Sequence, residues 1–256
     1  MIEVRNITKF HGDQRVLDDV SFTVPEETYL GLVGPGGAGK SLMLKIVCGL
    51  VEPDSGAVVV DGQHVHDLDV AELADLRMRM GMLFQNYALF DSMTVAENIA
   101  FPMRQAGDAD ESEIERRVGS ILDEIGLPRA GSKFPGELSG GMKKRVSFAR
   151  AVIRRPKLLF YDDPSAGLDP VTASKIFELL ETLKREYRTT AITVSHNIDG
   201  IRDVSDRVVM LDAGSKRFEG PVDEVADSSD PRVRDFWSSY AVDAEHDGRA
   251  AAEVDR

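Results

Sequence analysis

Long apolar runs and cysteines are scarce in this sequence. Cys48 is the single cysteine, so the chain forms no internal disulfide, which fits a reducing compartment. No stretch approaches the roughly 18 to 20 consecutive apolar residues that a membrane-spanning helix needs. The N-terminus, MIEVRNITKF, has no cationic apolar leader, so we expect no secretion signal. We therefore expect the chain to stay in the cytoplasm, with any link to a membrane supplied by a partner.

An excess of basic residues is also missing. The chain has 31 lysines and arginines against 44 aspartates and glutamates, which gives a formal net charge of −13. Proteins that bind DNA or RNA more often carry a basic face, so we expect no nucleic-acid partner. Basic residues do cluster along one expected helix, where we interpret them as a solvated face or a helix-end charge effect. The cluster consists of Lys143, Lys144, Arg145, Arg150, Arg154 and Arg155.

A glycine-rich octapeptide follows the apolar run YLGLVG and precedes an expected helix from residue 40 to about residue 50. It fits the G-x-x-x-x-G-K-S pattern of a phosphate-binding loop, or P-loop. Its glycines let backbone N–H groups surround phosphate oxygens, and the helix N-terminus adds a favourable dipole. We expect the loop to bind a nucleotide, with Lys40 reaching the β- and γ-phosphates and the Ser41 hydroxyl ligating Mg²⁺. The loop consists of Gly34, Pro35, Gly36, Gly37, Ala38, Gly39, Lys40 and Ser41.

A second candidate segment for the chemistry of the site is LLFYDD, residues 158–163, an apolar run that ends in two acids. Asp162 falls where a carboxylate holds the Mg²⁺ shell in P-loop proteins. Buried strands commonly end in Asp at a turn, so this pattern is weak alone and strong beside a P-loop. TAITVSH, residues 190–196, predicts another buried strand, with a helix over residues 171–186 between the two. This βαβ order implies a parallel sheet.

The pentapeptide LSGGM lies between the P-loop and the acidic strand. Ser139, Gly140 and Gly141 open an expected helix over residues 139–154. A helix N-terminus binds anions, and Ser139 is also a good helix cap, so the segment fits both an anion site and a plain helix start. The two interpretations are compatible.

The order of P-loop, LSGGM and acidic strand is similar to that of ABC transporter ATP-binding subunits, over nearly the whole chain. The resemblance implies an α/β P-loop fold of ABC-ATPase type. Its parts are a mostly parallel sheet core, an N-terminal antiparallel β subdomain and an inserted helical subdomain. The ATPase domain would cover residues 1–242, with the helical subdomain at about 86–156. Residues 243–256 are acidic and Ala-rich, and we expect a disordered tail.

The resemblance also implies roles for single residues. Gln85, at the end of MGMLFQ, would help to ligate Mg²⁺ and sense the γ-phosphate. His196, at the end of TAITVSH, would contact the γ-phosphate. Residues 166–169 would form the D-loop that joins two nucleotide sites. In this family the LSGG segment faces the ATP of a second copy, so two copies would sandwich two ATP molecules head to tail.

Two site positions depart from the family pattern. Asp163 stands where the family usually has a Glu that acts as general base on the attacking water. Its carboxylate is one methylene shorter, so we predict ATP hydrolysis at a reduced rate; the alternative is a turn residue before Pro164. The aromatic residue that usually stacks on adenine is replaced by His11, with Phe10 beside it as the alternative. Met142 replaces the commoner Gln of the motif outside its anion-binding part.

Three segments resemble one branch of the family, the Mla/Mce-type systems that move phospholipids between bacterial membranes. The segments are GMLFQNYALFDSMTVAENIAFPMR, YDDPSAGLDPVTAS and DPRVRDFWSSY. This resemblance implies membrane permease subunits and an MCE-domain lipid-binding protein as partners. It also implies a position on the cytoplasmic face of the inner membrane, held there by the permease. Residues 86–104 would receive the permease's coupling helix, or serve as ordinary core of the helical subdomain.

Other functions are compatible with parts of the sequence. An ABC importer for another solute, such as an amino acid, would use the same nucleotide chemistry. A soluble ABC ATPase acting on DNA or ribosomes usually carries two cassettes or a long coiled-coil insertion, and this chain has neither. A slow nucleotide-sensing module would fit the shorter base at Asp163.

Overall fold

The structure is a computed structural model that describes residues 1–83, 88–107 and 109–239. Gln85 and the predicted tail at residues 243–256 lie outside the described residues. The chain forms two compact units. Unit 1 contains Met1–His66 and Thr193–Arg256, and unit 2 contains Asp67–Ile192.

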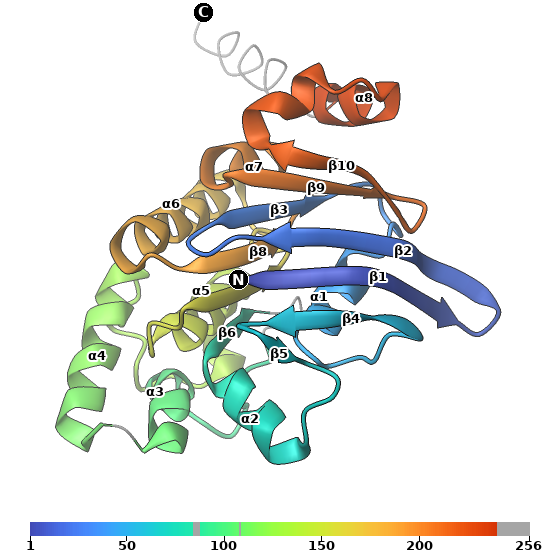
Figure 1. The fold of residues 1–256 in the computed structure, drawn as a ribbon. Coiled ribbons are helices and arrows are strands. Elements are labelled where there is room, and N and C mark those ends of the chain that lie inside the picture. The colour runs from blue at the N-terminus through green and yellow to red at the C-terminus, as the bar shows by residue number, and fades with distance from the viewer. Residues whose placement is uncertain (84–87, 108, 240–256) are drawn as a thin grey trace, which may run out of the picture. The chain divides into compact units, whose positions relative to one another are not determined.

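Unit 1 begins with a four-stranded antiparallel sheet in the order β2-β1-β4-β5 (Figure 1). Apolar residues alternate along its strands, so that one face is buried. Ile2 of β1, for example, pairs with Val24 of β2 and with Val60 of β4, and all three are buried. The strands are β1 (Ile2–His11), β2 (Gln14–Val24), β4 (Ser55–Val60) and β5 (Gln63–His64). The predicted N-terminal antiparallel part is therefore present.

Unit 1 also holds three strands of a second sheet. β3 (Tyr29–Val33) runs parallel to β9 (Arg207–Asp212), and β9 pairs antiparallel with β10 (Ser215–Pro221). Every residue of β3 is buried, as expected for a strand covered on both faces. The predicted turn between the last two strands lies at Gly214, which adopts a φ of 79°.

The tip of the β9–β10 hairpin contacts β2. The amide of Asp18 donates to the carbonyl of Gly214 at 2.9 Å. A Cβ atom at Gly214 would lie 2.4 Å from the carbonyl oxygen of Val16, so only glycine fits there. This contact joins the C-terminal hairpin to the N-terminal sheet within unit 1.

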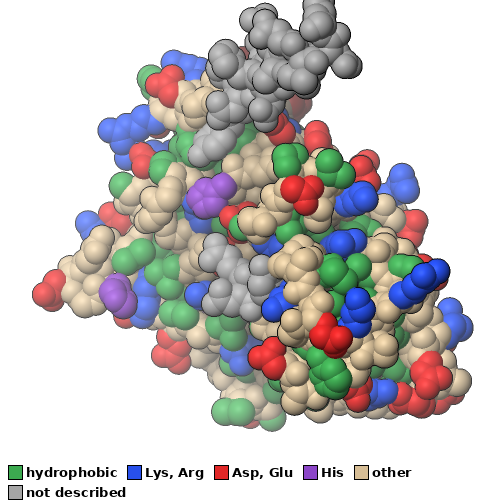
Figure 2. Space-filling view, turned by 180° about the vertical axis from the view of Figure 1, so that it is seen from behind, with side chains coloured by type: hydrophobic (Ala, Val, Ile, Leu, Met, Phe, Trp, Pro, Cys, Tyr) green, Lys and Arg blue, Asp and Glu red, His purple; other side chains and the backbone are tan. Residues whose placement is uncertain are grey.

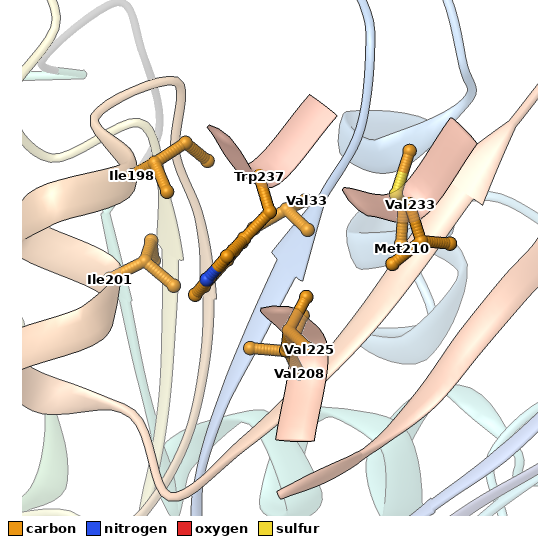
Figure 3. Close-up of a cluster of buried hydrophobic side chains, with 8 residues drawn as sticks. All are labelled: Val33, Ile198, Ile201, Val208, Met210, Val225, Val233 and Trp237. Atoms are coloured by element: carbon orange, nitrogen blue, oxygen red, sulfur yellow. The ribbon is translucent and has the colours of Figure 1, made fainter. Parts of the chain in front are cut away.

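The described residues of unit 1 also form the helices α1 (Lys40–Val47), α7 (Ile198–Val204) and α8 (Pro231–Ser239) and the 3-10 helix η2 (Val222–Asp227). Figure 3 shows the apolar cluster that holds the C-terminal part, with the Trp237 ring near Ile198 and Ile201 of α7. The Arg202 guanidinium lies 4.8 Å from the centre of the Trp237 ring and donates to the Trp237 carbonyl. The cluster consists of Val33, Ile198, Ile201, Val208, Met210, Val225, Val233 and Trp237. These contacts anchor α8, which the sequence predicts at residues 231–240.

Unit 2 contains two parallel strands and most of the helices. β6 (Met80–Leu83) pairs with β7 (Leu158–Asp162), which is buried along its full length. The boundary between the units falls inside β8 (Thr190–Val194). The helical segments are α2 (Val70–Met78), α3 (Val95–Ala106), α4 (Glu111–Glu124), η1 (Pro135–Glu137), α5 (Gly140–Val152) and α6 (Pro170–Tyr187).

Side-chain caps determine where several helices of unit 2 begin. Thr94 and Glu97 form a reciprocal capping box at the start of α3, and Asp110 caps α4. Gly107 ends α3 and Asp110 starts α4, so two helices cover this stretch of unit 2. The expected helical subdomain, residues 86–156, falls within unit 2, and its existence as a separate subdomain stays a prediction.

The predicted fold class is confirmed by this architecture and by the solved structures reported below: an α/β core with parallel strands, an antiparallel N-terminal sheet and inserted helices. Among the described residues, no helix is long and apolar enough to cross a membrane. Figure 2 shows acidic and basic side chains interspersed over the visible face, rather than gathered by sign.

Candidate nucleotide-binding site

The P-loop connects β3 to α1 in a backbone conformation that requires glycine. Gly34 adopts a φ of 139°, and a Cβ atom there would lie 1.9 Å from the carbonyl oxygen of Leu211. Gly39 adopts a φ of 93° immediately before the first residue of α1. The carboxyl end of the buried strand β3 and the N-terminus of α1 thereby meet at one turn. This is the arrangement that presents backbone N–H groups to a phosphate.

Lys40 lies inside this loop. Its side chain is 5% exposed, and its ammonium group donates to the carbonyls of Gly34 at 2.7 Å and Pro35 at 2.8 Å. A buried ammonium needs such partners, because burial without hydrogen bonds is costly. These hydrogen bonds hold the positive charge at the N-terminus of α1, where we expect the phosphates to bind.

A pocket in unit 1 brings the P-loop together with His196. It is lined by residues 36–42, by His196 and by Val16 of β2. His196 is exposed and follows β8, while the neighbouring Asn197 caps α7 by accepting from the amide of Gly200. The structure therefore places two sequence-predicted parts of the site, the P-loop and His196, at one pocket.

Val16 is a lining residue that sequence reasoning missed. It sits on β2, and its carbonyl would lie 3.2 Å from a Cβ atom at Gly39, so the strand is in close contact with the loop. Neither His11 nor Phe10 is among the residues that line this pocket. Both are exposed at the end of β1, where Asp54 accepts from the Phe10 amide at 2.6 Å and from Lys9 at 3.0 Å. Which of the two stacks on adenine stays open.

In unit 2, the buried strand β7 ends in Asp162, and a second acid, Asp163, follows it directly. Asp162 and Asp163 are 3% and 6% exposed, respectively. Asp163 adopts a φ of 54°, a left-handed conformation that is uncommon for residues other than glycine. Its carbonyl accepts from the amide of Ala166 at 3.2 Å, so the chain turns at once after the strand. The predicted acidic segment LLFYDD, residues 158–163, is called the Walker B segment in P-loop proteins. It thus consists of a buried strand with both acids at its carboxyl end.

The LSGGM segment forms the start of α5. Ser139 is the N-cap, and its hydroxyl accepts from the amide of Met142 at 3.3 Å. Gly140 and Gly141 form the first turn. Ser139 therefore caps α5 in the structure, as one of the two interpretations of this segment predicts. It leaves the other first-turn N–H groups available for an anion.

Most of the basic cluster on α5 does not form a solvated face, so that interpretation of it from the sequence was wrong; the alternative, a helix-end charge effect, fits Arg150 in the last turn of α5. Lys144 is 1% exposed, and burial lowers its pKa although the carboxylates of Asp163 and Asp162 act in the opposite direction. Arg145 donates to the carbonyl of Ile125 at 2.8 Å, and Arg150 donates to the carbonyl of Ala88 at 2.7 Å. These long cations bridge α5 to its neighbours in unit 2.

The helical periodicity of α5 indicates that Lys144 is buried, although its residue type indicates an exposed side chain. Lys144, Phe148 and Val152 are spaced four apart, so they share one face of α5, and all three are buried. A lysine at such a position is normally expected to point to solvent. Its burial therefore follows from the spacing rather than from the side chain.

The oxygen donors expected for Mg²⁺ suit that ion. Ser41 supplies a hydroxyl at the P-loop in unit 1, and Asp162 supplies a carboxylate at the end of β7 in unit 2. The described residues contain no group of three or more His, Cys, Asp or Glu side chains that could hold a metal by themselves.

Comparisons with known proteins agree with this geometry. The ABC transporter family model matches residues 17–166. The methionine import ATP-binding protein MetN 2 of Pseudomonas entomophila is 40% identical over 229 residues, which cover 88% of this chain and 68% of that protein. The probable ribonucleotide transport ATP-binding protein mkl of Mycobacterium tuberculosis is 39% identical over 241 residues, which cover 94% of this chain and 67% of that protein.

Solved structures give the same result. The dimeric structure of MJ0796, a bacterial ABC transporter cassette, has a TM-score of 0.82 and 32% identity, and covers 87% of this chain and 99% of that chain. The cbiO1 protein from Clostridium perfringens, part of the transporter complex cbiONQ, has a TM-score of 0.78 and 28% identity, and covers 89% of this chain and 90% of that chain. Cassettes of this kind bind ATP, typically with Mg²⁺, and act as dimers with membrane permease subunits. The chain belongs to the ABC transporter family, as an ATP-binding subunit.

Proposed function

We propose that this chain hydrolyses ATP between two copies of itself and thereby drives a permease that moves phospholipid. The observation that carries the nucleotide part is the pocket of unit 1, because the P-loop and His196 line the same pocket. In this proposal Lys40 and the loop amides bind the phosphates, while His196 contacts the γ-phosphate. Ser41, Asp162 and Gln85 hold Mg²⁺, which neutralises phosphate charge when it is bound.

Asp163 is the general base in this proposal. Asp163 is buried directly after the last residue of β7, and the turn that begins there restrains the position of its carboxylate. The reach of the side chain is shorter than that of Glu, so proton removal from the attacking water is slower. We therefore propose a working but slow ATPase.

The LSGGM segment, which we call the signature segment, completes the nucleotide site of a second copy. The N-terminus of α5 presents N–H groups of residues 140 and 141, and a γ-phosphate is a suitable anion for them. Two copies arranged head to tail then bury two ATP molecules. The dimeric structure of MJ0796, a similar cassette, supports a dimer. A lone chain is nearly inert, because its P-loop lacks the second half of the site.

A surface in unit 2 supports the permease contact. Phe90 is 41% exposed, its ring lies 4.8 Å from that of Phe101, and the Arg150 guanidinium lies 5.7 Å from the Phe90 ring. An aromatic side chain held at the surface by neighbours is a typical anchor in protein interfaces. We propose that this surface receives the permease on the cytoplasmic face of the inner membrane.

The cargo rests on the sequence segments that resemble phospholipid-trafficking ATPases. The relatives named above are described as serving methionine import and ribonucleotide transport, at nearly equal identities of 40% and 39%. Overall cassette similarity therefore does not choose between cargoes. The alternative to phospholipid is an importer for another solute such as an amino acid, which the methionine-import relatives favour.

Purification of the tagged chain from its own cells tests the proposal. We expect a permease, an MCE-domain protein and phospholipid to co-purify, and we expect the complex to hydrolyse ATP. A permease together with an amino-acid-binding protein would overturn the phospholipid cargo. The absence of any membrane protein would overturn the transporter function. The absence of ATP turnover in the intact complex would leave a nucleotide-sensing module.

A further inference from the structure

Lys144, the buried lysine of α5, contacts the segment that carries Asp163, the candidate general base. The ammonium group of Lys144 donates to the carbonyl of Asp163 at 2.8 Å and to the carbonyl of Ala166 at 2.7 Å. Asp163 ends the Walker B segment, and Ala166 starts the D-loop, residues 166–169. One side chain therefore joins α5 to both segments within unit 2.

The backbone at Asp163 benefits from such a contact. Its φ of 54° lies in the left-handed region, which costs a residue with a Cβ atom about 1 kcal/mol or more. A charged donor on the Asp163 carbonyl favours the conformation in which that carbonyl points toward α5. The first turn after β7 is thus held by Lys144 as well as by its own turn hydrogen bond.

The first turn of α5 lies close to the same D-loop. A Cβ atom added at Gly141 would lie 3.5 Å from a methyl carbon of Leu168, which is an ordinary van der Waals distance. Lys144 lies one helical turn after Gly141. The start of α5 therefore lies beside the segment that follows β7, and the hydrogen bonds of Lys144 join the two.

We propose that Lys144 is a positioning residue for ATP hydrolysis, which fixes the Asp163 backbone so that its short carboxylate reaches the attacking water. This inference rests on the proposed function, in which Asp163 is the base. A Glu at that position has an additional rotatable bond, with which it can correct a displaced backbone. An Asp has less freedom, so its reach depends more on where its backbone is held.

The test compares variants in the intact transporter complex. Lys144→Met removes both hydrogen bonds but keeps a long side chain, and we expect kcat to fall about tenfold or more while KM for ATP changes less than about twofold. Lys144→Gln keeps an amide donor, and we expect it to restore part of the rate. In an Asp163→Glu background, Lys144→Met should lower kcat by a clearly smaller factor.

Lys175→Met serves as the matched control, because this lysine is exposed on α6 and its change should leave kcat and KM as they are. If Lys144→Met fails to fold, Lys144→Gln is compared in the two backgrounds instead. The proposal is overturned if kcat is unaffected, if kcat and KM change together, or if the loss is equal with Asp163 and with Glu at that position. A wild-type complex without turnover would instead overturn the proposed function.

Discussion

The side chain of Asn98 holds the backbone of Phe90 through both of its polar groups. Its amide oxygen accepts from the Phe90 amide at 2.8 Å, and its nitrogen donates to the Phe90 carbonyl at 3.0 Å. The same nitrogen also donates to the carbonyls of Met93 and Thr94. Asn98 is fully buried on α3, so the exposed Phe90 ring is presented by a polar contact beneath it.

We predict that Asn98→Ala destabilises the chain and disturbs Phe90. The change removes the hydrogen bonds from the Asn98 side chain to the backbone of the Phe90–Thr94 segment, so the free energy of unfolding should fall by roughly 2 to 3 kcal/mol. Denaturant unfolding measures this loss. Gln105→Ala removes an exposed amide from the same helix and should change the free energy by less than about 0.5 kcal/mol. Equal effects of the two changes would contradict the prediction.

A second prediction concerns the start of the P-loop. Gly34→Ala places a methyl group 1.9 Å from the Leu211 carbonyl oxygen at a φ of 139°, so β9 must move. We expect the free energy of unfolding to fall by more than roughly 3 kcal/mol, with loss of nucleotide binding. Gly36→Ala meets no atom within 4 Å and should keep the thermal midpoint. A stable Gly34→Ala variant would show that this contact is incorrect.

A third prediction concerns Trp237, the single tryptophan of the chain. Its side chain is 4% exposed, so the native fluorescence should be blue-shifted and should move to the red when α8 leaves unit 1. Trp237→Ala should lower the free energy of unfolding by roughly 3 to 5 kcal/mol, measured by circular dichroism. Val171→Ala, at an exposed position, should have little effect. Red-shifted native emission would place Trp237 outside the core.

A fourth prediction concerns an acid on α4. Hydrogen bonds from Arg116 and Arg117 lower the pKa of Glu113 from 4.5 to about 2. The stabilisation from this depressed pKa is present above about pH 4.5 and is lost as the pH falls toward 2. Replacing both arginines with alanine should raise the pKa of Glu113 toward 4.5, as measured by carboxyl NMR titration. Because Glu113 is exposed, the change in stability should be small.

The last prediction concerns the candidate base. Asp163→Glu in the transporter complex should raise kcat by about 3- to 10-fold, because the longer side chain brings the carboxylate nearer to the attacking water. Asp163→Asn keeps the shape but removes the base, so kcat should fall strongly while ATP still binds. An unchanged or lower rate with Glu would count against Asp163 as a short general base.

Local patterns predicted most of the fold. The P-loop lies between β3 and α1, as its glycines require, and Ser139 caps the helix that follows it. The strand β7 and the helix α6 follow from apolar runs and periodicity that do not depend on distant residues. The short helix α7 was not predicted, because seven residues carry too little periodic pattern to distinguish it from a loop.

The parts of the site that depend on distant contacts were not predictable. Val16 reaches the pocket because β2 lies against the P-loop, and nothing in the local sequence of β2 indicates this. Lys144 was misjudged because a lysine is normally solvated, and the carbonyls that accept its hydrogen bonds lie 19 and 22 residues away. In both cases tertiary structure decided what local residue type could not.

The contact between Gly214 and Val16 has a consequence for how the pocket is made during synthesis. The wall of the nucleotide pocket on β2 is braced by a hairpin tip almost 200 residues later in the chain, through the bond from Asp18 to Gly214. A nascent chain emerges from the ribosome N-terminus first. The P-loop therefore leaves the ribosome long before its brace exists, and we expect the growing chain to acquire nucleotide affinity only after residue 214 has emerged.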